Sequence, residues 1–264
     1  MNKYLAVFKI NWENALVYRL NFSLWRVRSV LQLLLVYFIW FSVFQSQQRI
    51  FGYDQSSILT YILIAALVRA IVLSSRVMDV ANVINEGSVA NFFLKPISFI
   101  GYYFIRDLSD KLLNISFVIF ELALILFLLK PSILIQKNLS ILALFLLAVF
   151  LGLFLFFIIS FIVGLMSFWV ENSWGLFFLM YIFLETFGGG IFPIDILPSP
   201  YSQIFLIAPF PYLLYFPAKI YLGTLAVPEL VKGFFILSFW IIVLYFLMVK
   251  LYRAGIRQYS AVGH

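Results

Sequence analysis

The sequence predicts an all-α polytopic membrane protein with six transmembrane helices, an amino-terminal interfacial amphipathic helix and short re-entrant helices before the last span. Three observations support this fold class. Hydrophobic residues make up 64% of the 264 residues and charged residues only 11%, whereas soluble domains carry charge on about a quarter of their residues. Apolar runs of about 20 residues, enough to cross a bilayer as a helix, recur along the chain. A Gly- and Pro-rich stretch interrupts them before the last run.

Residues 1–22 predict a helix that lies in the membrane interface. Leu5, Phe8 and Trp12 recur at helical spacing, and polar side chains such as Lys9 and Glu13 occupy the rest of the wheel. Two interpretations stay open. The helix is either an anchor before the first span or an element that transmits movement from a cytoplasmic partner.

Six apolar runs predict the transmembrane spans, and together they leave no stretch for a soluble catalytic domain, so we expect one transmembrane domain over residues 1–264. In the fourth run, small residues such as Gly152 and Gly164 permit close helix approach, either within the chain or across an oligomer interface. The expected spans are 24–45, 58–75, 108–129, 139–169, 174–190 and 230–250.

The distribution of positive charge orients these spans. Of the 18 Lys and Arg residues, 12 fall on the side of the termini and 5 on the other side, with Arg69 inside a span. Because cytoplasmic segments of membrane proteins carry the positive excess, we expect both termini in the cytoplasm. This bias and anionic lipid explain the net charge of +7, so no nucleic-acid partner is expected.

Residues 76–107 form a cytoplasmic connection that is far longer than a turn between two helices requires. Val83 and Gly87 fall on one face, Asp79 and Glu86 lie towards the ends, and Pro96 stops the preceding helix. The pattern favours a short amphipathic helix beside the membrane, followed by a second interfacial helix. A passive linker remains the alternative.

Residues 188–228 are too apolar for an ordinary loop and too rich in Gly and Pro for one continuous span. Irregular backbone at membrane depth is tolerated only where it is buried in protein or lines a water-filled path. This stretch, the Gly/Pro segment, therefore indicates transport, and the orientation above places it on the outer side. We expect its aromatic residues to form an apolar plug, namely Phe205, Phe210, Tyr212, Tyr215 and Phe216.

Among the ionisable residues of the expected spans, three lie well away from the span ends, where a charge usually faces a partner or an aqueous cavity. Arg69 and Glu121 are predicted to form a structural ion pair. Glu185 lies one turn before the glycines of the Gly/Pro segment, and its role stays open between structure and pathway.

Several function classes are disfavoured by what the sequence lacks. The chain has no cysteine, and its only histidine is His264, so thiolate, zinc and histidine chemistry are not expected. No GxxxxGK[ST] motif occurs, and the run Gly188–Gly190 has no accompanying lysine, so no nucleotide-phosphate site is expected in this chain. We therefore expect no enzyme, no cofactor and no metal site. An ion-coupled secondary transporter is the alternative function, although such proteins usually show broken spans in both halves.

In the order of these features, the whole chain resembles the type 2 ABC exporter permeases, specifically a bacterial branch of about 260 residues. The motifs Glu86-Gly87-Ser88 and Leu94-Lys95-Pro96 lie between the second and third spans, as in that family. The resemblance implies that about 79–95 couples to a nucleotide-binding subunit, with Asp79, Val83, Glu86, Gly87, Ser88, Leu94, Lys95 and Pro96 as candidate residues. It also implies an outer gate at about 188–221, with Gly188, Gly189, Gly190, Pro193, Pro198, Phe210, Pro211 and Tyr212 as candidates.

The same resemblance implies the partners and the mechanism. Two ABC ATPase subunits would bind ATP and Mg, and a second permease, identical or related, would complete the pathway. The expected location is the bacterial cytoplasmic membrane, and the expected mechanism is ATP-driven alternating access in the export direction. The substrate stays open among amphipathic or lipid-linked molecules, hydrophobic peptides and drug-like compounds.

Overall fold

A computed structural model describes residues 3–17, 19–75, 78–93 and 96–262. Two short strands, β1 Arg49–Ile50 and β2 Tyr53–Asp54, accompany the helices. The helices are α1 Lys3–Val17, α2 Arg19–Val43, α3 Gln55–Val72, α4 Met78–Asn85, α5 Ala90–Phe93, α6 Phe99–Leu129, α7 Leu139–Leu165, α8 Trp174–Phe187, α9 Tyr201–Phe205, α10 Tyr215–Leu222 and α11 Val227–Val262, with 3-10 turns η1 Met166–Phe168, η2 Ile194–Ile196 and η3 Phe210–Tyr212.

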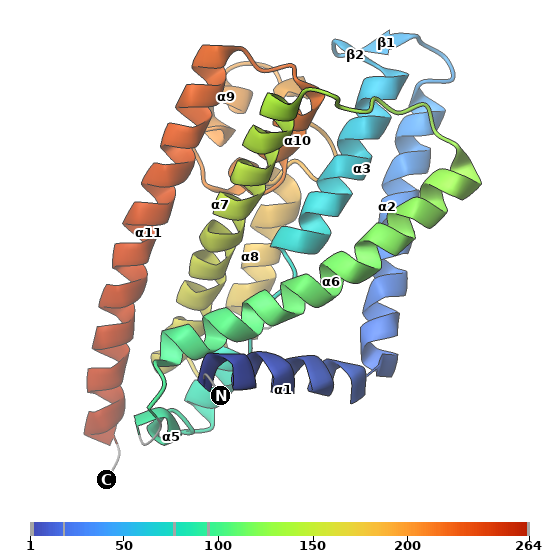
Figure 1. Cartoon of the computed structure of the whole chain (residues 1–264). Coiled ribbons are helices and arrows are strands. Elements are labelled where there is room, and N and C mark those ends of the chain that lie inside the picture. Colours follow the sequence, from blue (N-terminus) through green and yellow to red (C-terminus); the bar gives the residue numbers. More distant parts are fainter. Residues whose placement is uncertain (1–2, 18, 76–77, 94–95, 263–264) are drawn as a thin grey trace.

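The helices form a bundle with two distinct ends (Figure 1). Helices α2, α3, α7, α8 and α11 run along the bundle, α6 crosses it obliquely, and α1 lies across one end. Both termini lie at that end, which we call the terminal end. The β1–β2 hairpin, α9 and α10 lie at the opposite end, which we call the hairpin end.

Five helices in the described part of the chain are long and apolar enough to cross a membrane: α2, α3, α6, α7 and α11. The expected fifth span, 174–190, is instead the 14-residue helix α8. At 1.5 Å per residue α8 is about 21 Å long, shorter than the roughly 30 Å of a bilayer core. Sequence reasoning counted a full span here because the apolar run continues into the glycines that end the helix.

Helix α6 begins earlier than the expected span at 108. It starts at Phe99, where Ser98 is the N-cap and accepts a hydrogen bond from the amide of Gly101. It ends at Leu129, where Lys130 adopts a left-handed conformation before Pro131. Part of the 76–107 connection is thus the first two turns of α6, and α1 packs against this helix.

The hairpin at the opposite end starts α3. Phe51 and Gly52 both have positive φ, as a two-residue hairpin turn requires, and they pair Ile50 with Tyr53. Asp54 then caps α3 by accepting a hydrogen bond from the amide of Ser57. This hydrogen bond lowers the pKa of Asp54.

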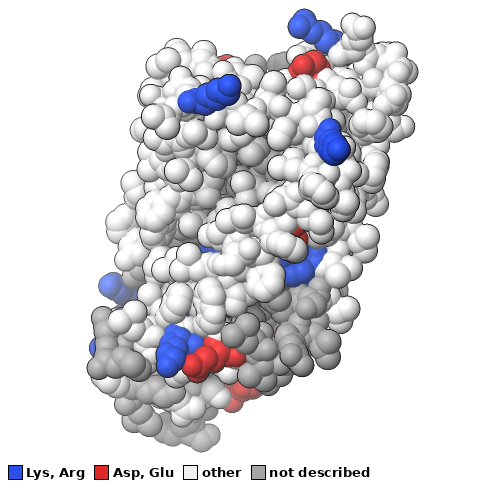
Figure 2. Space-filling model, turned by 45° about the vertical axis from the view of Figure 1, so that its right-hand side comes forward, with Lys and Arg blue, Asp and Glu red and all other residues white. Residues whose placement is uncertain are grey.

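The surface along the bundle is apolar, as expected of a membrane protein. In the space-filling view the charged atoms lie mostly towards the two ends, and the middle is largely uncharged (Figure 2). Large exposed hydrophobic side chains on the long helices make up this belt, among them Leu31, Leu35, Phe38, Phe117, Phe120, Phe127, Phe235, Phe239 and Phe246.

Small residues of α7 serve packing within the chain. A Cβ at Gly152 would lie 3.7 Å from the carbonyl oxygen of Tyr212 and 3.8 Å from Val72 of α3. Ala148 is fully buried one turn earlier. Of the two interpretations of this small-residue pair, the structure supports close approach inside one chain.

Candidate functional site

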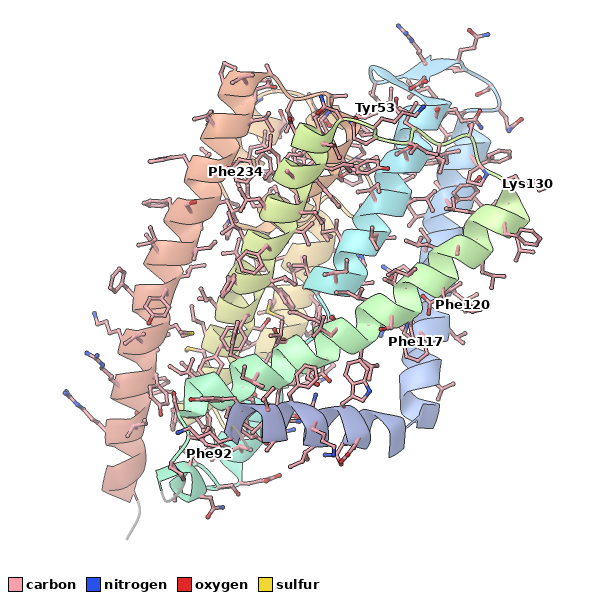
Figure 3. All side chains as sticks on the ribbon, viewed as in Figure 1. Tyr53, Phe92, Phe117, Phe120, Lys130 and Phe234 are labelled. Carbon is pink, nitrogen blue, oxygen red and sulfur yellow. The ribbon has the colours of Figure 1, made fainter. Side chains whose placement is uncertain are left out.

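The 76–107 segment places a short helix at the terminal end. Val80 and Ile84 of α4 are buried in a cluster with Phe99, Tyr103 and Phe161, and α4 packs against the end of α7. Phe92 of the same cluster is labelled at the terminal end in Figure 3. The buried face fixes α4 against the bundle, so its other face is free to meet a partner.

Most coupling candidates of this segment lie on or beside that free face. Glu86 and Gly87 are exposed in the turn after α4, Val83 is half-buried, and the amide of Ser88 donates to the carbonyl of Val83. Gly87 has a φ of +70°, which favours glycine. Pro96 is exposed, and its carbonyl accepts a hydrogen bond from Lys3 of α1.

Asp79 behaves differently from the other coupling candidates. Its carboxylate lies 2.7 Å from Nη2 of Arg106 on α6, so it ties α4 to that helix. Leu94 and Lys95 lie outside the described residues.

A buried polar cluster joins α1, α3 and α6 just above α4. Lys111 is 1% exposed; its ammonium lies 3.3 Å from Asp107 and donates to the carbonyls of Val72 and Ser74 at 2.8 and 2.7 Å. It therefore satisfies carbonyls at the carboxyl end of α3, where a positive charge also complements the helix dipole. Asn11 of α1 donates to Asp110 at 3.0 Å.

Asn11 is a polar residue of the expected interfacial helix that the structure buries. Leu5, on the apolar side of the wheel, is 61% exposed, as a lipid-facing side chain would be, whereas Asn11 is 4% exposed. The polar residue is buried because Asp110 of α6 supplies its hydrogen-bond partner.

At the hairpin end, side chains from α2, α3 and α11, and one from the segment itself, satisfy carbonyl groups of the Gly/Pro segment. Such partners are needed because backbone outside regular helices has no internal ladder of hydrogen bonds. The amide of Tyr215 also donates to the carbonyl of Gly188 at 3.0 Å. The side-chain donors are Tyr61 to Gly189, Trp40 to Ile191 at 2.9 Å, Tyr212 within the segment to Leu206 at 2.8 Å, and Trp240 to Ile207 at 2.8 Å.

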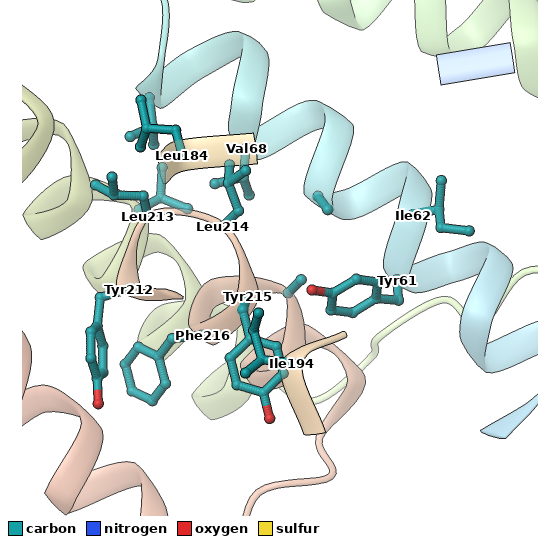
Figure 4. Close-up of a cluster of buried hydrophobic side chains, with 14 of the residues drawn as sticks. Tyr61, Ile62, Val68, Leu184, Ile194, Tyr212, Leu213, Leu214, Tyr215 and Phe216 are labelled. Atoms are coloured by element: carbon teal, nitrogen blue, oxygen red, sulfur yellow. The ribbon is translucent and has the colours of Figure 1, made fainter. Parts of the chain in front are cut away.

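The expected gate residues divide between buried and exposed positions. Gly188, Gly189, Pro193, Pro211 and Tyr212 are buried, Gly190 and Phe210 are half-buried, and Pro198 is exposed at the turn before α9. Figure 4 shows Tyr212, Tyr215 and Phe216 among the side chains of the main core, together with Tyr61 and Ile194. Three of the five expected plug residues are therefore core residues. Phe210 stacks on Phe183 of α8, and Phe205 contacts Phe187 of α8 at a tilted angle.

A second network fastens α10 to the start of α3. Lys219, only 7% exposed, donates to the hydroxyl of Tyr53 and to Asp195, both at 2.9 Å, and Tyr53 donates to Asp195 at 2.9 Å. Figure 3 labels Tyr53 at the hairpin end. Burial, together with the carboxylate of Asp195, raises the pKa of Tyr53, so its hydroxyl stays protonated and remains a donor.

Two ion pairs lie between these ends, and they correct the expected pairing. Arg69 of α3 pairs with Glu185 of α8, with Nη2 at 2.9 Å from Oε2. Glu121 of α6 pairs instead with Arg26 of α2, with Nε at 2.6 Å from Oε1. The predicted Arg69–Glu121 pair is wrong, because each residue has a different partner on another helix.

The two arginines line one cavity. Its walls come from α2, α3 and α6, and Gly190 of the Gly/Pro segment closes one side. A Cβ on Gly190 would lie 2.0 Å from Nη2 of Arg69, so a side chain at this position would have to displace the guanidinium. The ion pair of Arg69 and the start of the Gly/Pro segment thus form one packed unit.

The comparison with protein families fits this architecture. A family model described as an ABC-2 family transporter protein matches residues 30–263. The chain belongs to the ABC-2 transporter family. This permease is a multi-pass membrane protein and a subunit of an ABC transporter, which works together with an ATPase subunit. A search among curated proteins gives no significant match.

Sequence reasoning missed several residues that organise the permease. From the sequence, Arg26 and Lys111 count only among the 12 positive charges on the side of the termini. The spacing of Asp107 and Lys111, one helical turn apart, was the available signal for a buried ion pair. Asp195, Lys219 and Trp40 gave no comparable signal, because their partners lie far away in the sequence.

Proposed function

We propose that this permease forms half of the translocation pathway of an ATP-driven exporter. Two ATPase subunits, which bind ATP and Mg, dock at the terminal end, and a second permease, identical or related, supplies the other half. The chain itself has no catalytic residue and holds no cofactor. Both termini face the cytoplasm of a bacterial cell. Helix α8 and the re-entrant segment after it together make the fifth of six crossings.

Beyond membership of the family, one structural arrangement supports this proposal. The exposed turn at Glu86 and Gly87 follows a helix that is firmly packed at the terminal end, while the Gly/Pro segment lies at the hairpin end. A partner that moves the α4 turn would act on α6 through Asp79 and Arg106. Closure of the ATPase subunits would then separate the two permeases beneath the Gly/Pro segment.

Co-purification tests the docking surface. A tagged wild-type permease, expressed with the rest of its operon, should retain an ATP-hydrolysing subunit, and Glu86→Lys should lose most of it. Glu13→Lys is the matched control, because Glu13 is an exposed glutamate on α1 at the same end of the bundle. Proton- or sodium-driven flux by the permease alone, or equal retention of the ATPase subunit by both variants, would contradict the proposal.

A further inference from the structure

The cavity between α2, α3 and α6 has the construction of a binding site for a polar group. Its volume is about 60 Å³, and since one water needs roughly 15 Å³ of such space, it has room for several waters or a small head group. Arg26, Gln32, Arg69 and Glu121 are the larger polar side chains that line it. All four belong to candidate membrane-spanning helices, where polar side chains are costly unless they serve a partner.

Hydrogen-bond donors remain unused in this cavity. A guanidinium has five N–H donors. The hydrogen bonds of Arg69 use two of its N–H groups, on Nη1 and Nη2, and those of Arg26 use three, on Nε, Nη1 and Nη2. The amide of Gln32, which is half-buried, makes no hydrogen bond within the part of the chain that the structure describes. The cavity therefore offers several donors to an oxygen-rich group.

The charge balance selects among such groups. Each arginine is already neutralised by a glutamate, so the two ion pairs carry no net charge together. An added anion would leave an uncompensated negative charge at membrane depth, and an added cation the opposite. A zwitterion adds no net charge, and it can place its anionic group against the guanidinium groups and its ammonium against Glu121.

The rest of the wall is apolar and indicates an attached hydrocarbon chain. Leu33, Val36, Ile62, Val118 and Leu122 line the same cavity. We propose that the cavity binds the zwitterionic head group of a single- or double-chain amphiphile, with Arg26, Arg69 and Gln32 facing its anionic part and Glu121 its ammonium. If the bound amphiphile is also the transported substrate, that part of the inference rests on the proposed function. The binding site itself does not depend on the proposed function.

Binding of three probes to the purified permease tests this site. The probes share one acyl chain and differ in charge: lysophosphatidylethanolamine is zwitterionic, lysophosphatidate is anionic, and monoacylglycerol is uncharged. Native mass spectrometry of the full chain in detergent measures the bound fraction. We expect lysophosphatidylethanolamine to bind about tenfold more tightly than either other probe.

Two variants and a control assign the binding to the cavity. Gln32→Leu should weaken binding of the zwitterion about fivefold, because it removes hydrogen bonds to a charged group. The double variant Arg69→Glu with Glu185→Arg keeps the ion pair but reverses the charge that faces the cavity, and it should abolish the preference. Gln45→Leu, in the exposed turn after the same helix, should bind as the wild type does. Because Gln32→Leu preserves side-chain size, it provides the test even if the double variant fails to fold.

The possible outcomes distinguish a failure of the binding-site inference from a failure of the proposed function. Equal binding of all probes, tighter binding of lysophosphatidate, or an unchanged preference in Gln32→Leu would overturn the inference. Binding as expected supports it, whether the ligand is a transported substrate, which would raise ATP hydrolysis of the assembled complex, or a resident lipid, which would not. Loss of the ATPase subunit from wild-type preparations would refute the proposed function alone, since the probes bind the permease by itself.

Discussion

Arg69 and Glu185 form an ion pair that joins α3 to α8, and the same arginine lies directly against Gly190. The side chains are 23% and 35% exposed, so the pair is partly shielded from solvent. Through this contact, α3, which ends close to the proposed coupling region, is fastened to the first residues of the Gly/Pro segment. The pair therefore links the two regions that the proposed mechanism must connect.

Removing one member of this pair should destabilise the permease more than reversing both. Arg69→Gln leaves Glu185 without its counter-charge, and we expect a loss of about 2–3 kcal/mol, below the range for fully buried pairs because these side chains are partly exposed. The double variant Arg69→Glu with Glu185→Arg should recover more than half of that loss. Thermal denaturation in detergent measures both. Equal melting temperatures for the single and double variants would show that the pair contributes nothing.

Gly190 should not tolerate even a methyl group. A Cβ there would lie 2.0 Å from the Arg69 guanidinium, so Gly190→Ala must displace either the arginine or the backbone of the Gly/Pro segment. We expect a destabilisation of about 1–3 kcal/mol, as overpacking of a filled site usually causes. The matched control is Gly175→Ala in α8, where nothing lies within 4 Å of the added carbon. A melting temperature of Gly190→Ala that equals that of the control would contradict the close packing.

Lys111→Met should be among the most damaging single changes. It leaves the carboxylate of Asp107 buried without its partner and leaves carbonyls of Val72 and Ser74 without a donor. We expect a loss of about 3–5 kcal/mol, visible as poor yield and early melting. Lys9→Met removes an exposed lysine from α1 and should change stability by less than about 0.5 kcal/mol.

If Asp107 is the reason for this loss, its removal should compensate. The double variant Lys111→Met with Asp107→Leu leaves no unpaired charge, and we expect it to melt well above Lys111→Met alone. If the double variant is no better than the single one, the role of Lys111 lies in capping α3 and not in the ion pair.

The orientation of the permease can be tested with single cysteines, because the natural chain has none. Tyr201→Cys lies at an exposed position of α9 at the hairpin end, and Glu86→Cys at the exposed turn after α4. A membrane-impermeant maleimide should label the first in intact cells and the second only after permeabilisation. The reverse pattern would place the termini outside.

Much of the fold was predictable because burial in lipid is a local property of each residue. Runs such as 139–169 become helices wherever they insert, since the bilayer leaves no other way to satisfy the backbone. The same reasoning overestimated α8, because the apolar run continues past the point where Gly188 ends the helix. Broken backbone at 188–228 was also predictable, since Gly and Pro disfavour a continuous helix wherever they cluster.

The pairing of charges was not predictable in this way. Position along a span gives the depth of Arg69, Glu121 and Glu185, but it does not say which helix faces which. The expected partner of Arg69 was at a compatible depth on α6, and the structure selects Glu185 on α8 instead. Likewise, the sequence pattern puts Asn11 on the polar side of its helix. The structure buries it, because Asp110 accepts a hydrogen bond from its side-chain amide.

The sequence by itself determined the membrane environment, the long helices, the helical start and the irregular segment before the last helix, because hydrophobicity and backbone preference act residue by residue. Only the tertiary structure decided which side chains satisfy the open carbonyls of the Gly/Pro segment, which glutamate neutralises which arginine, and that two such pairs share a cavity. Those relationships depend on the packing angle and rotation of each helix, which many weak contacts fix together.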